Sequence, residues 1–317
     1  MNTMLALIAK RIGAAALTLL LVSVVVFSIT ALLPGDAAQE ALGQSATPEM
    51  IAALRAQLGL DQPAHLRYLH WLFGMLSGDP GQSMANNMPV SELVRLRLPK
   101  SLLLAGSTAI VSVPIALLIG ILSAMYRGSR LDRALNVVTL SMVAVPEFLV
   151  ATVAVLIFAV KLHWLSALSY TPDHPTIGEF LRAYAMPVMT LCVVIVAQMA
   201  RMTRAALIEQ LGQSYVEMAV LKGVRPARVV LAHALPNAIG PIANAVALSL
   251  SYLLGGAIIV ETIFNYPGIA SLMVDAVTSR DMPLLQTCAM IFCCAYLALV
   301  LIADVCAILS NPKLRGP

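Results

Sequence analysis

The side chain best placed to do chemistry in this chain is Glu147, a carboxylate within a long apolar run. A carboxylate inside a membrane span costs about 2.5–3.5 kcal/mol on insertion scales, so it is expected to face a cavity or a partner. There it could meet the ammonium group of a substrate or a metal complex. The alternative interpretation is a structural hydrogen bond to a neighbouring helix, or a position close enough to the outer interface to stay wet.

Three further polar side chains, Asn244, Ser249 and Tyr252, interrupt a second apolar run. Such side chains can line a transport pathway, and they can equally form hydrogen bonds between membrane helices. Together with Glu147 they are the pathway candidates of this sequence.

Motifs for catalysis, nucleotide binding and metal binding are missing from the sequence. No Lys follows a Gly, so the phosphate-binding pattern G-x-x-x-x-G-K-[ST] does not occur, and neither does H-E-x-x-H. The five cysteines lie in apolar runs without metal-ligand spacing, which is typical of packing groups. We therefore predict no catalytic residue, no metal ligand and no cofactor in this chain, and an intramembrane enzyme is a poor interpretation.

The elements that must position these residues are membrane helices. Only 11% of the 317 residues are charged, against about 25% in soluble domains. Several apolar runs reach the length of about 20 residues that crosses a bilayer. We predict an all-α polytopic membrane protein with six transmembrane helices, at residues 12–33, 101–125, 134–160, 185–199, 236–260 and 287–309.

Basic residues predict the orientation of these spans. Lys and Arg gather at the N-terminus, in alternate loops and at the C-terminus, and an excess in short loops marks the cytoplasmic side. Both termini are therefore expected in the cytoplasm, in a multi-pass protein of the bacterial cytoplasmic (inner) membrane. The net charge of +4 mostly expresses this bias and gives no reason to expect nucleic acid as a partner.

Three regions follow from this topology. Residues 1–33 form an N-terminal tail and the first span, residues 34–100 an extracytoplasmic subdomain, and residues 101–317 a five-helix core. In the subdomain, Thr47 and Pro48 suit the start of a short amphipathic helix. A second apolar pattern, at Leu66, Leu69, Phe73 and Leu76, precedes a Gly/Pro break. The subdomain is interpreted either as a docking surface for an external partner or as a cap over the bundle.

The polar segment 201–236, between the fourth and fifth spans, is longer than a turn requires. A helix is expected over 215–222, and Gly223 permits the left-handed cap that ends it. Pro226 suits the first turn of a second short helix that runs to about His233, after which Leu235 and Pro236 start the fifth span. A rigid cytoplasmic helix joined through a glycine corner can pass rigid-body motion to the spans on both sides.

This segment resembles the EAA-loop signature of binding-protein-dependent ATP-binding-cassette importer permeases. Glu217, Ala219, Gly223, Leu235 and Pro236 match the pattern, while Met218 and His233 depart from it. Further motifs are similar to those of the dipeptide/oligopeptide/nickel subfamily, at residues 33–36, 78–79, 260–264, 267–268, 280–281 and 311–312. Where that subfamily carries Ser-x-Pro-x-Phe in the third span, this chain has Ala144, Val145, Pro146, Glu147 and Phe148.

The resemblance implies a permease subunit of an importer for dipeptides, oligopeptides or similar small solutes. It also implies the partners: a second homologous permease in a heterodimer, two ATPase subunits that bind ATP and Mg, and an extracytoplasmic solute-binding protein. Coupling to the ATPase is then expected of Glu217, Ala219, Lys222, Gly223, Leu235 and Pro236. A permease for nickel or a metal-chelator complex, and a self-contained secondary transporter in the lipid bilayer, remain alternatives, and the sequence does not choose among peptide, glutathione-like, opine and nickel substrates.

Overall fold

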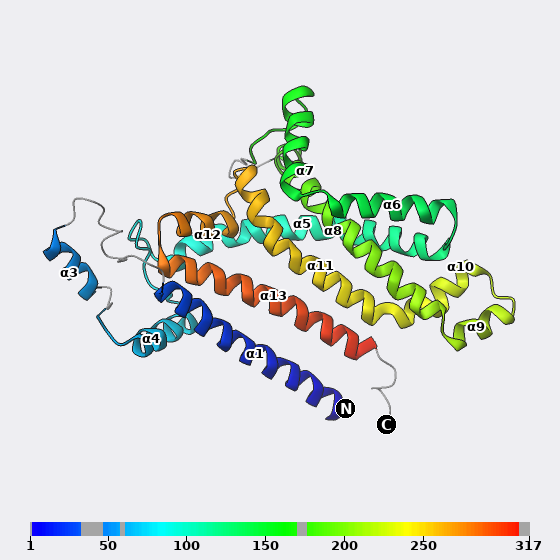
Figure 1. Cartoon of the computed structure of the whole chain (residues 1–317), viewed down its shortest axis with the longest axis horizontal. Coiled ribbons are helices and arrows are strands. Elements are labelled where there is room, and N and C mark those ends of the chain that lie inside the picture. Colours follow the sequence, from blue (N-terminus) through cyan, green and yellow to red (C-terminus); the bar gives the residue numbers. More distant parts are fainter. Residues whose placement is uncertain (1, 33–46, 58–60, 170–175, 311–317) are drawn as a thin grey trace. The chain divides into compact units, whose positions relative to one another are not determined.

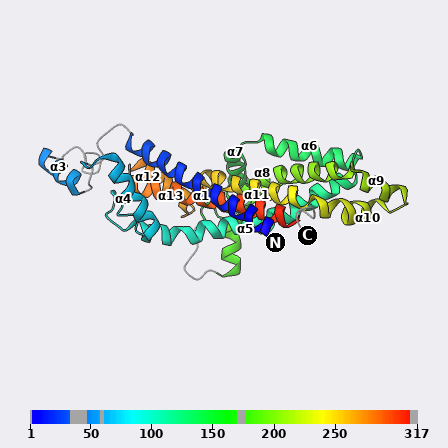
Figure 2. The same cartoon turned by 90° about the horizontal axis from the view of Figure 1, so that it is seen from below.

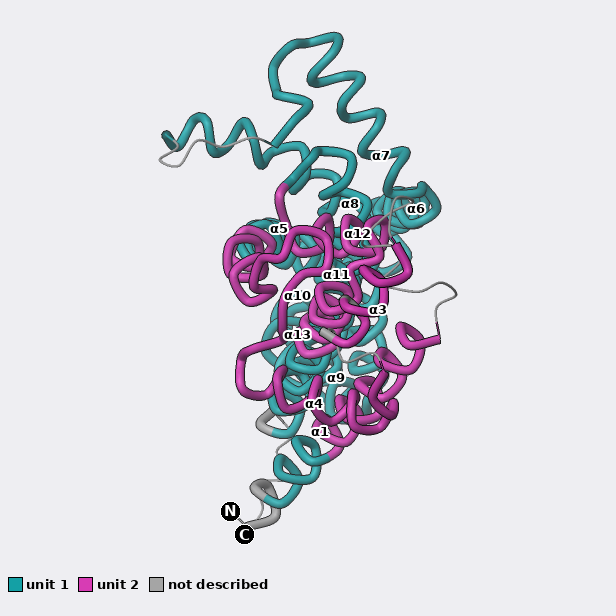
Figure 3. The backbone as a smooth tube through the Cα atoms, turned by 90° about the vertical axis from the view of Figure 1, so that its left-hand side faces the viewer, with its two compact units in different colours: residues 1–13, 102–266, 296–317 teal, residues 14–101, 267–295 magenta. Residues whose placement is uncertain are grey.

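The computed structural model describes residues 2–32, 47–57, 61–169 and 176–310. Contacts divide the chain into two compact units, shown in Figure 3. Unit 1 comprises residues 1–13, 102–266 and 296–317, and unit 2 comprises residues 14–101 and 267–295. The motifs at 33–36 and 311–312 lie outside the described residues. The predicted three-region division of the chain stays a prediction.

Helices account for every regular element among the described residues, as expected for an all-α protein (Figure 1). In chain order they are α1 (Asn2–Ala31), α3 (Pro48–Gln57), α4 (Ala64–Ser77), α5 (Val90–Met125), α6 (Arg130–Ala144), α7 (Glu147–Ala154), η1 (Val155–Lys161), α8 (Ile177–Leu211), α9 (Ser214–Leu221), α10 (Pro226–Arg228), η2 (Val229–Ala234), α11 (Leu235–Ile263), α12 (Ile269–Thr278) and α13 (Met282–Ser310). The η elements are π-helices, which have a wider turn than α-helices.

Five of the described helical segments are long and apolar enough to cross a membrane. They are Ala6–Ala31, Val90–Met125, Ile177–Leu211, Pro226–Ile263 and Met282–Ile308. These segments overlap five of the six predicted spans, at 12–33, 101–125, 185–199, 236–260 and 287–309. Pro187 and Pro241 lie inside α8 and α11 without ending them, as neighbouring helices in a membrane permit.

The predicted third span differs from the expectation of one helix over 134–160. Segments Arg130–Ala144 and Glu147–Lys161 meet at an angle of 96°. The break falls at Val145 and Pro146: proline lacks an N–H, and its ring pushes the preceding residue out of the helical region. Val145 accordingly has φ −86° and ψ 125°. The predicted third span is therefore a pair of helices with a sharp bend rather than one straight helix.

Unit 1 is built around α8, which contacts α6, α7 and α11 (Figure 1). Its large side chains Met186, Leu191, Ile195 and Met199 are fully buried and form the centre of the largest apolar core. Such a helix, apolar on most of its circumference, is stable in the middle of a bundle rather than at its edge.

Unit 2 joins the first part of α5 to α12 and the first part of α13. Val90, Ile269, Leu272, Leu284 and Cys288 form its apolar core. Polar contacts hold the helix starts: the Ile269 N–H donates to Ser101 Oγ over 2.8 Å, and Ser83 donates to the Asp281 carboxylate. Gln286 Nε2 donates to Thr30 Oγ1 over 2.5 Å and so links α13 to α1.

Candidate functional site

The loop after α8 contains the helix and the glycine corner that the sequence predicts. Helix α9 ends at Leu221, and Gly223 follows in the left-handed region with φ 75°. The Gly223 N–H donates to the Val220 carbonyl over 2.9 Å, and the Val224 N–H donates to the Ala219 carbonyl over 3.2 Å. This pair of bonds is the Schellman arrangement, which needs a residue that tolerates positive φ at its corner. The predicted local geometry of Gly223 is confirmed.

Helix α9 has one face on the bundle and one face open. Val216 and Ala219 are buried, and α9 contacts α8 and η2. The open face carries large apolar side chains, with Leu221 74% exposed. The exposed members are Tyr215, Met218, Val220 and Leu221. A cluster of exposed apolar side chains next to the charged Glu217 and Lys222 is typical of a protein interaction surface.

The chain after the corner differs from the prediction of a second short helix followed by a new span. It is helical without interruption from Pro226 to Ile263, because α10, η2 and α11 follow directly on one another. Pro236 has no N–H for the carbonyl four residues before it, and the preceding turn is π-helical. Leu235 and Pro236 therefore lie within one continuous helix that begins at Pro226.

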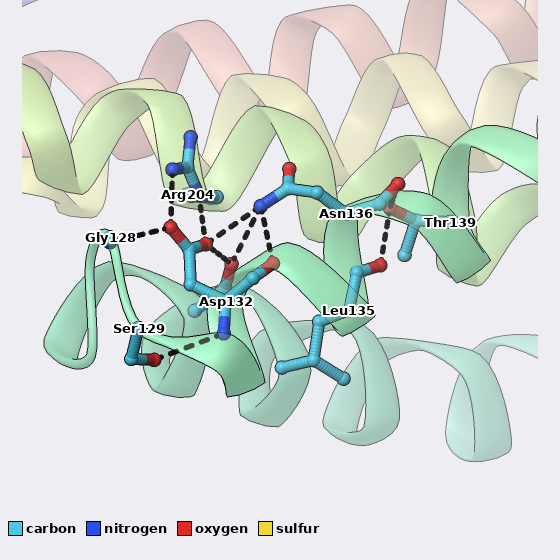
Figure 4. Close-up of polar contacts among 8 residues, drawn as sticks. Gly128, Ser129, Asp132, Leu135, Asn136, Thr139 and Arg204 are labelled. Atoms are coloured by element: carbon cyan, nitrogen blue, oxygen red, sulfur yellow. Dashed lines mark hydrogen bonds and ion pairs between the residues drawn. The ribbon is translucent and has the colours of Figure 1, made fainter.

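A buried polar cluster around Asp132 lies in unit 1, which also contains α9 (Figure 4). The carboxylate accepts from Arg204 through two bonds, Nε to Oδ1 at 2.8 Å and Nη2 to Oδ2 at 2.9 Å. Ser123 Oγ donates to Oδ1 over 2.5 Å, Asn136 Nδ2 donates to the same oxygen over 2.7 Å, and the Gly128 N–H donates to Oδ2 over 2.9 Å. The Asp132 side chain is only 5% exposed.

The cluster joins three helices at the end of unit 1 that carries α9. Ser123 belongs to α5, Asp132 and Asn136 to α6, and Arg204 to α8, shortly before α8 leads into α9. Figures 1 and 2 show the turn between α5 and α6 at the same end of the unit as α9 and α10. A bidentate arginine–carboxylate pair fixes both distance and angle between its helices. The cluster thus holds α5 and α6 to the part of α8 that precedes the glycine-cornered loop.

Sequence analysis missed this cluster. Arg204 is one of the basic residues whose positions predict orientation, and no motif in the sequence points to Asp132. One local signal was available: Ser129 starts α6 and its Oγ accepts from the Asp132 N–H over 3.2 Å, the pattern of a helix cap with an acidic third residue. That signal predicts a helix start, and it says nothing of Arg204, which is 72 positions away.

Glu147 is the first residue of α7, and its side chain is 8% exposed. Its Oε1 has no hydrogen-bond partner among the described residues. The carboxylate lies against α11 at Gly256, where an added Cβ would be 2.8 Å from both Oε1 and Oε2. Among the described residues no helix donates a hydrogen bond to Oε1, and the role of Glu147 stays a prediction.

The four pathway candidates divide into two pairs. Glu147 and Ser249 are buried, and the Ser249 hydroxyl also lacks a partner within the described part of the chain. Asn244 and Tyr252 are exposed on the surface of α11. The chain does not gather the four into one pocket. In the described ranges there is also no group of three or more His, Cys, Asp or Glu side chains placed to hold a metal ion.

Comparison with known proteins places this architecture in a family. Residues 116–316 match the binding-protein-dependent transport system inner membrane component, and residues 4–105 match the N-terminal part of such membrane components. The chain belongs to this family, so it is a transport permease subunit and a multi-pass protein of the inner membrane. Membership of binding-protein-dependent importers implies ATPase and solute-binding partners.

Relatives align over nearly the whole chain. A probable peptide ABC transporter permease protein, y4tP, of Sinorhizobium fredii is 33% identical over 97% of this chain and 98% of its own length. The glutathione transport system permease protein GsiC of Salmonella choleraesuis is 36% identical, over 98% of this chain and 99% of its own. GsiC of Escherichia coli K12 is 34% identical over the same shares. These relatives favour neither a nickel permease nor a self-contained secondary transporter.

Proposed function

We propose that this chain carries peptides or small peptide-like solutes across the inner membrane as one permease of a heterodimer. Two kinds of support converge on this function. The relatives named above are peptide and glutathione permeases, and each aligns with the chain from end to end. The chain itself presents the open face of α9, the feature that a docked ATPase subunit would cover. ATP and Mg are bound by those partner subunits.

The open face of α9 is the single observation that carries the coupling role. Glu217 and Lys222 are exposed beside Leu221 and can meet an ATPase groove directly. Ala219 is buried, so its part is to hold α9 on the bundle. Gly223 sets the corner, while Leu235 and Pro236 continue the movement into α11. In this proposal the loop and both termini lie in the cytoplasm.

We also propose that the contact between Glu147 and Gly256 closes the pathway. A carboxylate that lies against a neighbouring helix without a partner for Oε1 is available to a cationic group once α7 and α11 separate. Ser249 precedes Gly256 in α11, and its hydroxyl also has no partner among the described residues. Asn244 and Tyr252, on the exposed side of α11, face lipid or the second permease.

Substitution of the glycine corner tests the coupling role. In Gly223→Val, a β-branched side chain must adopt a φ of 75°, which it strongly disfavours. The complete transporter should assemble in the membrane and hydrolyse ATP, while uptake falls at least tenfold. The matched control is Gly212→Val, because Gly212 lies in the same loop at φ −82° and should retain most of its uptake. Normal coupled uptake by Gly223→Val would refute the coupling role.

Competition for uptake tests the substrate class separately. The complete transporter with its binding protein, in proteoliposomes loaded with ATP, should import a labelled dipeptide or glutathione. Unlabelled peptides should compete, and nickel with or without a chelator should not. Competition by nickel complexes alone would reject the peptide class and leave the permease role unaffected.

A further inference from the structure

Helix α4 in unit 2 carries a row of exposed apolar side chains. Phe73 is 66% exposed and Leu76 is 76% exposed. Leu66 and Leu69 continue the row toward the start of the helix and are also exposed. The spacing of three and four residues places all four on one face of a helix. A soluble surface seldom leaves such a row uncovered, so this face has an occupant.

The other side of α4 lies on α1. The Tyr68 hydroxyl forms a hydrogen bond of 2.8 Å with Ser23 Oγ, and the Tyr68 ring packs edge-on against Phe27, with centroids 5.5 Å apart. The Trp71 ring lies 5.8 Å from Phe27. Figure 1 shows α4 beside the end of α1 that follows these residues. Tyr68 and Trp71 therefore hold α4 to the first span.

A second contact ties α4 to α13. Thr287 Oγ1 lies 3.6 Å from Met75 Sδ. Thr287 is close to the start of the apolar segment Met282–Ile308, just as Phe27 is close to the end of Ala6–Ala31. Helix α4 is thus held against two membrane spans at once, in each case near the span's end.

The positions of these contacts along the spans give the depth of α4. At a rise of 1.5 Å per residue, Phe27 and Ser23 lie about 6 and 12 Å before Ala31, and Thr287 about 7–8 Å after Met282. Spans of 26 and 27 residues are about 40 Å long, so each end extends about 5 Å beyond a hydrocarbon core of about 30 Å. The contact side of α4 therefore lies at the outer edge of the hydrocarbon.

We propose that α4 is an interfacial helix and that Leu66, Leu69, Phe73 and Leu76 contact the acyl chains of a phospholipid bilayer at the headgroup boundary. Tyr68 and Trp71 lie at the level where aromatic side chains anchor membrane proteins. Arg67, whose guanidinium carbon is 5.9 Å from the centroid of the Phe27 ring, supplies a cation that suits lipid phosphate. The proposal rests on membrane location alone and not on substrate or coupling.

Photocrosslinking identifies the occupant of this face directly. Phe73 is replaced by benzoylphenylalanine in the complete transporter, which is irradiated in native membranes with its binding protein present. We expect the permease to gain the mass of a phospholipid. The matched control is the same replacement at Tyr215 in α9, which should give an adduct with a protein. A protein adduct at position 73, with the binding protein or the second permease, would overturn the proposal, and so would the absence of any adduct.

Fluorescence quenching measures depth independently. The chain has two tryptophans, Trp71 and Trp164, and both are replaced by Phe before Phe73→Trp is introduced. Phe at position 71 keeps an aromatic ring beside Phe27, and Tyr68 keeps its hydrogen bond to Ser23. Lipids brominated near the headgroup should quench this single tryptophan at least twofold more than lipids brominated near the chain end. Leu21→Trp, on an exposed mid-span position, should show the opposite order, and Tyr215→Trp should show little quenching. Equal and weak quenching of Phe73→Trp and Tyr215→Trp would contradict an interfacial position.

Discussion

Asp132 and Glu147 are two buried carboxylates of unit 1 with opposite surroundings. Asp132 accepts bonds from Arg204, Ser123, Asn136 and the Gly128 backbone. Glu147 meets a glycine, and its Oε1 has no partner in the described part of the chain. The Asp132 carboxylate thus accepts hydrogen bonds from residues of α5, α6, α8 and the turn before α6, whereas the Glu147 carboxylate is buried against α11.

The difference supports a structural role for Asp132 and the proposed pathway role for Glu147. A buried carboxylate with an arginine and several donors fixes its helices, and removing one partner leaves a charge that the interior cannot solvate. A buried carboxylate with an unpartnered oxygen contributes little to the fold. An ionisable group in a membrane span is costly to bury, and this supports the proposal that Glu147 serves transport. The comparison predicts opposite responses to substitution at the two sites.

The largest effect is expected from Arg204→Ala. It leaves Asp132 buried without its cation, and the free energy of unfolding should fall by about 3–5 kcal/mol. Unfolding by sodium dodecyl sulfate in mixed micelles measures this change. Arg201→Ala is the matched control, because Arg201 is exposed on the same helix, and the change there should stay below about 0.5 kcal/mol. Equal stability of the two variants would show that the cluster does not hold the fold.

A smaller loss is expected from Arg204→Lys. Lysine keeps the charge but cannot form the two parallel hydrogen bonds to Oδ1 and Oδ2. The free energy of unfolding should therefore fall by about 1.5–3 kcal/mol, which is the contribution of one hydrogen bond to a charged group. The same micelle titration applies. A variant as stable as the wild type would mean that charge alone, without the bidentate geometry, is sufficient.

At the second site, Gly256→Ala should lower the free energy of unfolding by about 1–2 kcal/mol. The added Cβ would lie 2.8 Å from both Glu147 carboxylate oxygens, so the Glu147 side chain must shift in a packed interior. Glu147→Ala in the same chain should restore most of the loss, and the double-mutant cycle gives the interaction energy. Gly106→Ala, where an added Cβ meets nothing within 4 Å, serves as the control. Additive losses in the double variant would exclude a direct contact between positions 147 and 256.

The smallest effect on stability is expected from Glu147→Gln, a change in the free energy of unfolding below about 1 kcal/mol. Oε1 forms no hydrogen bond within the described ranges that the amide would lose. Uptake should respond more strongly and fall several-fold for solutes with a free ammonium group. Transport assays over a wide pH range, at equal amounts of transporter in the membrane, check this. Normal uptake of every substrate throughout that range would remove Glu147 from the pathway.

Much of this architecture follows from short stretches of sequence. The apolar runs predict the spans because each run must bury its own backbone hydrogen bonds within the bilayer, whatever its neighbours are. The Gly223 corner is predicted because positive φ is a property of one residue. Similarity to the family rests on such local motifs, and it extends over almost the whole chain.

The sequence by itself therefore determined the class of protein, five of its apolar spans and the glycine corner after α9. The tertiary structure alone decided which residues meet. It placed Arg204 on Asp132, Glu147 on Gly256 and Tyr68 on Phe27. The physical reason is that helix formation depends on neighbours within a few residues, whereas these contacts join segments that are distant in the chain. Only the packing of whole helices brings such segments within hydrogen-bonding distance.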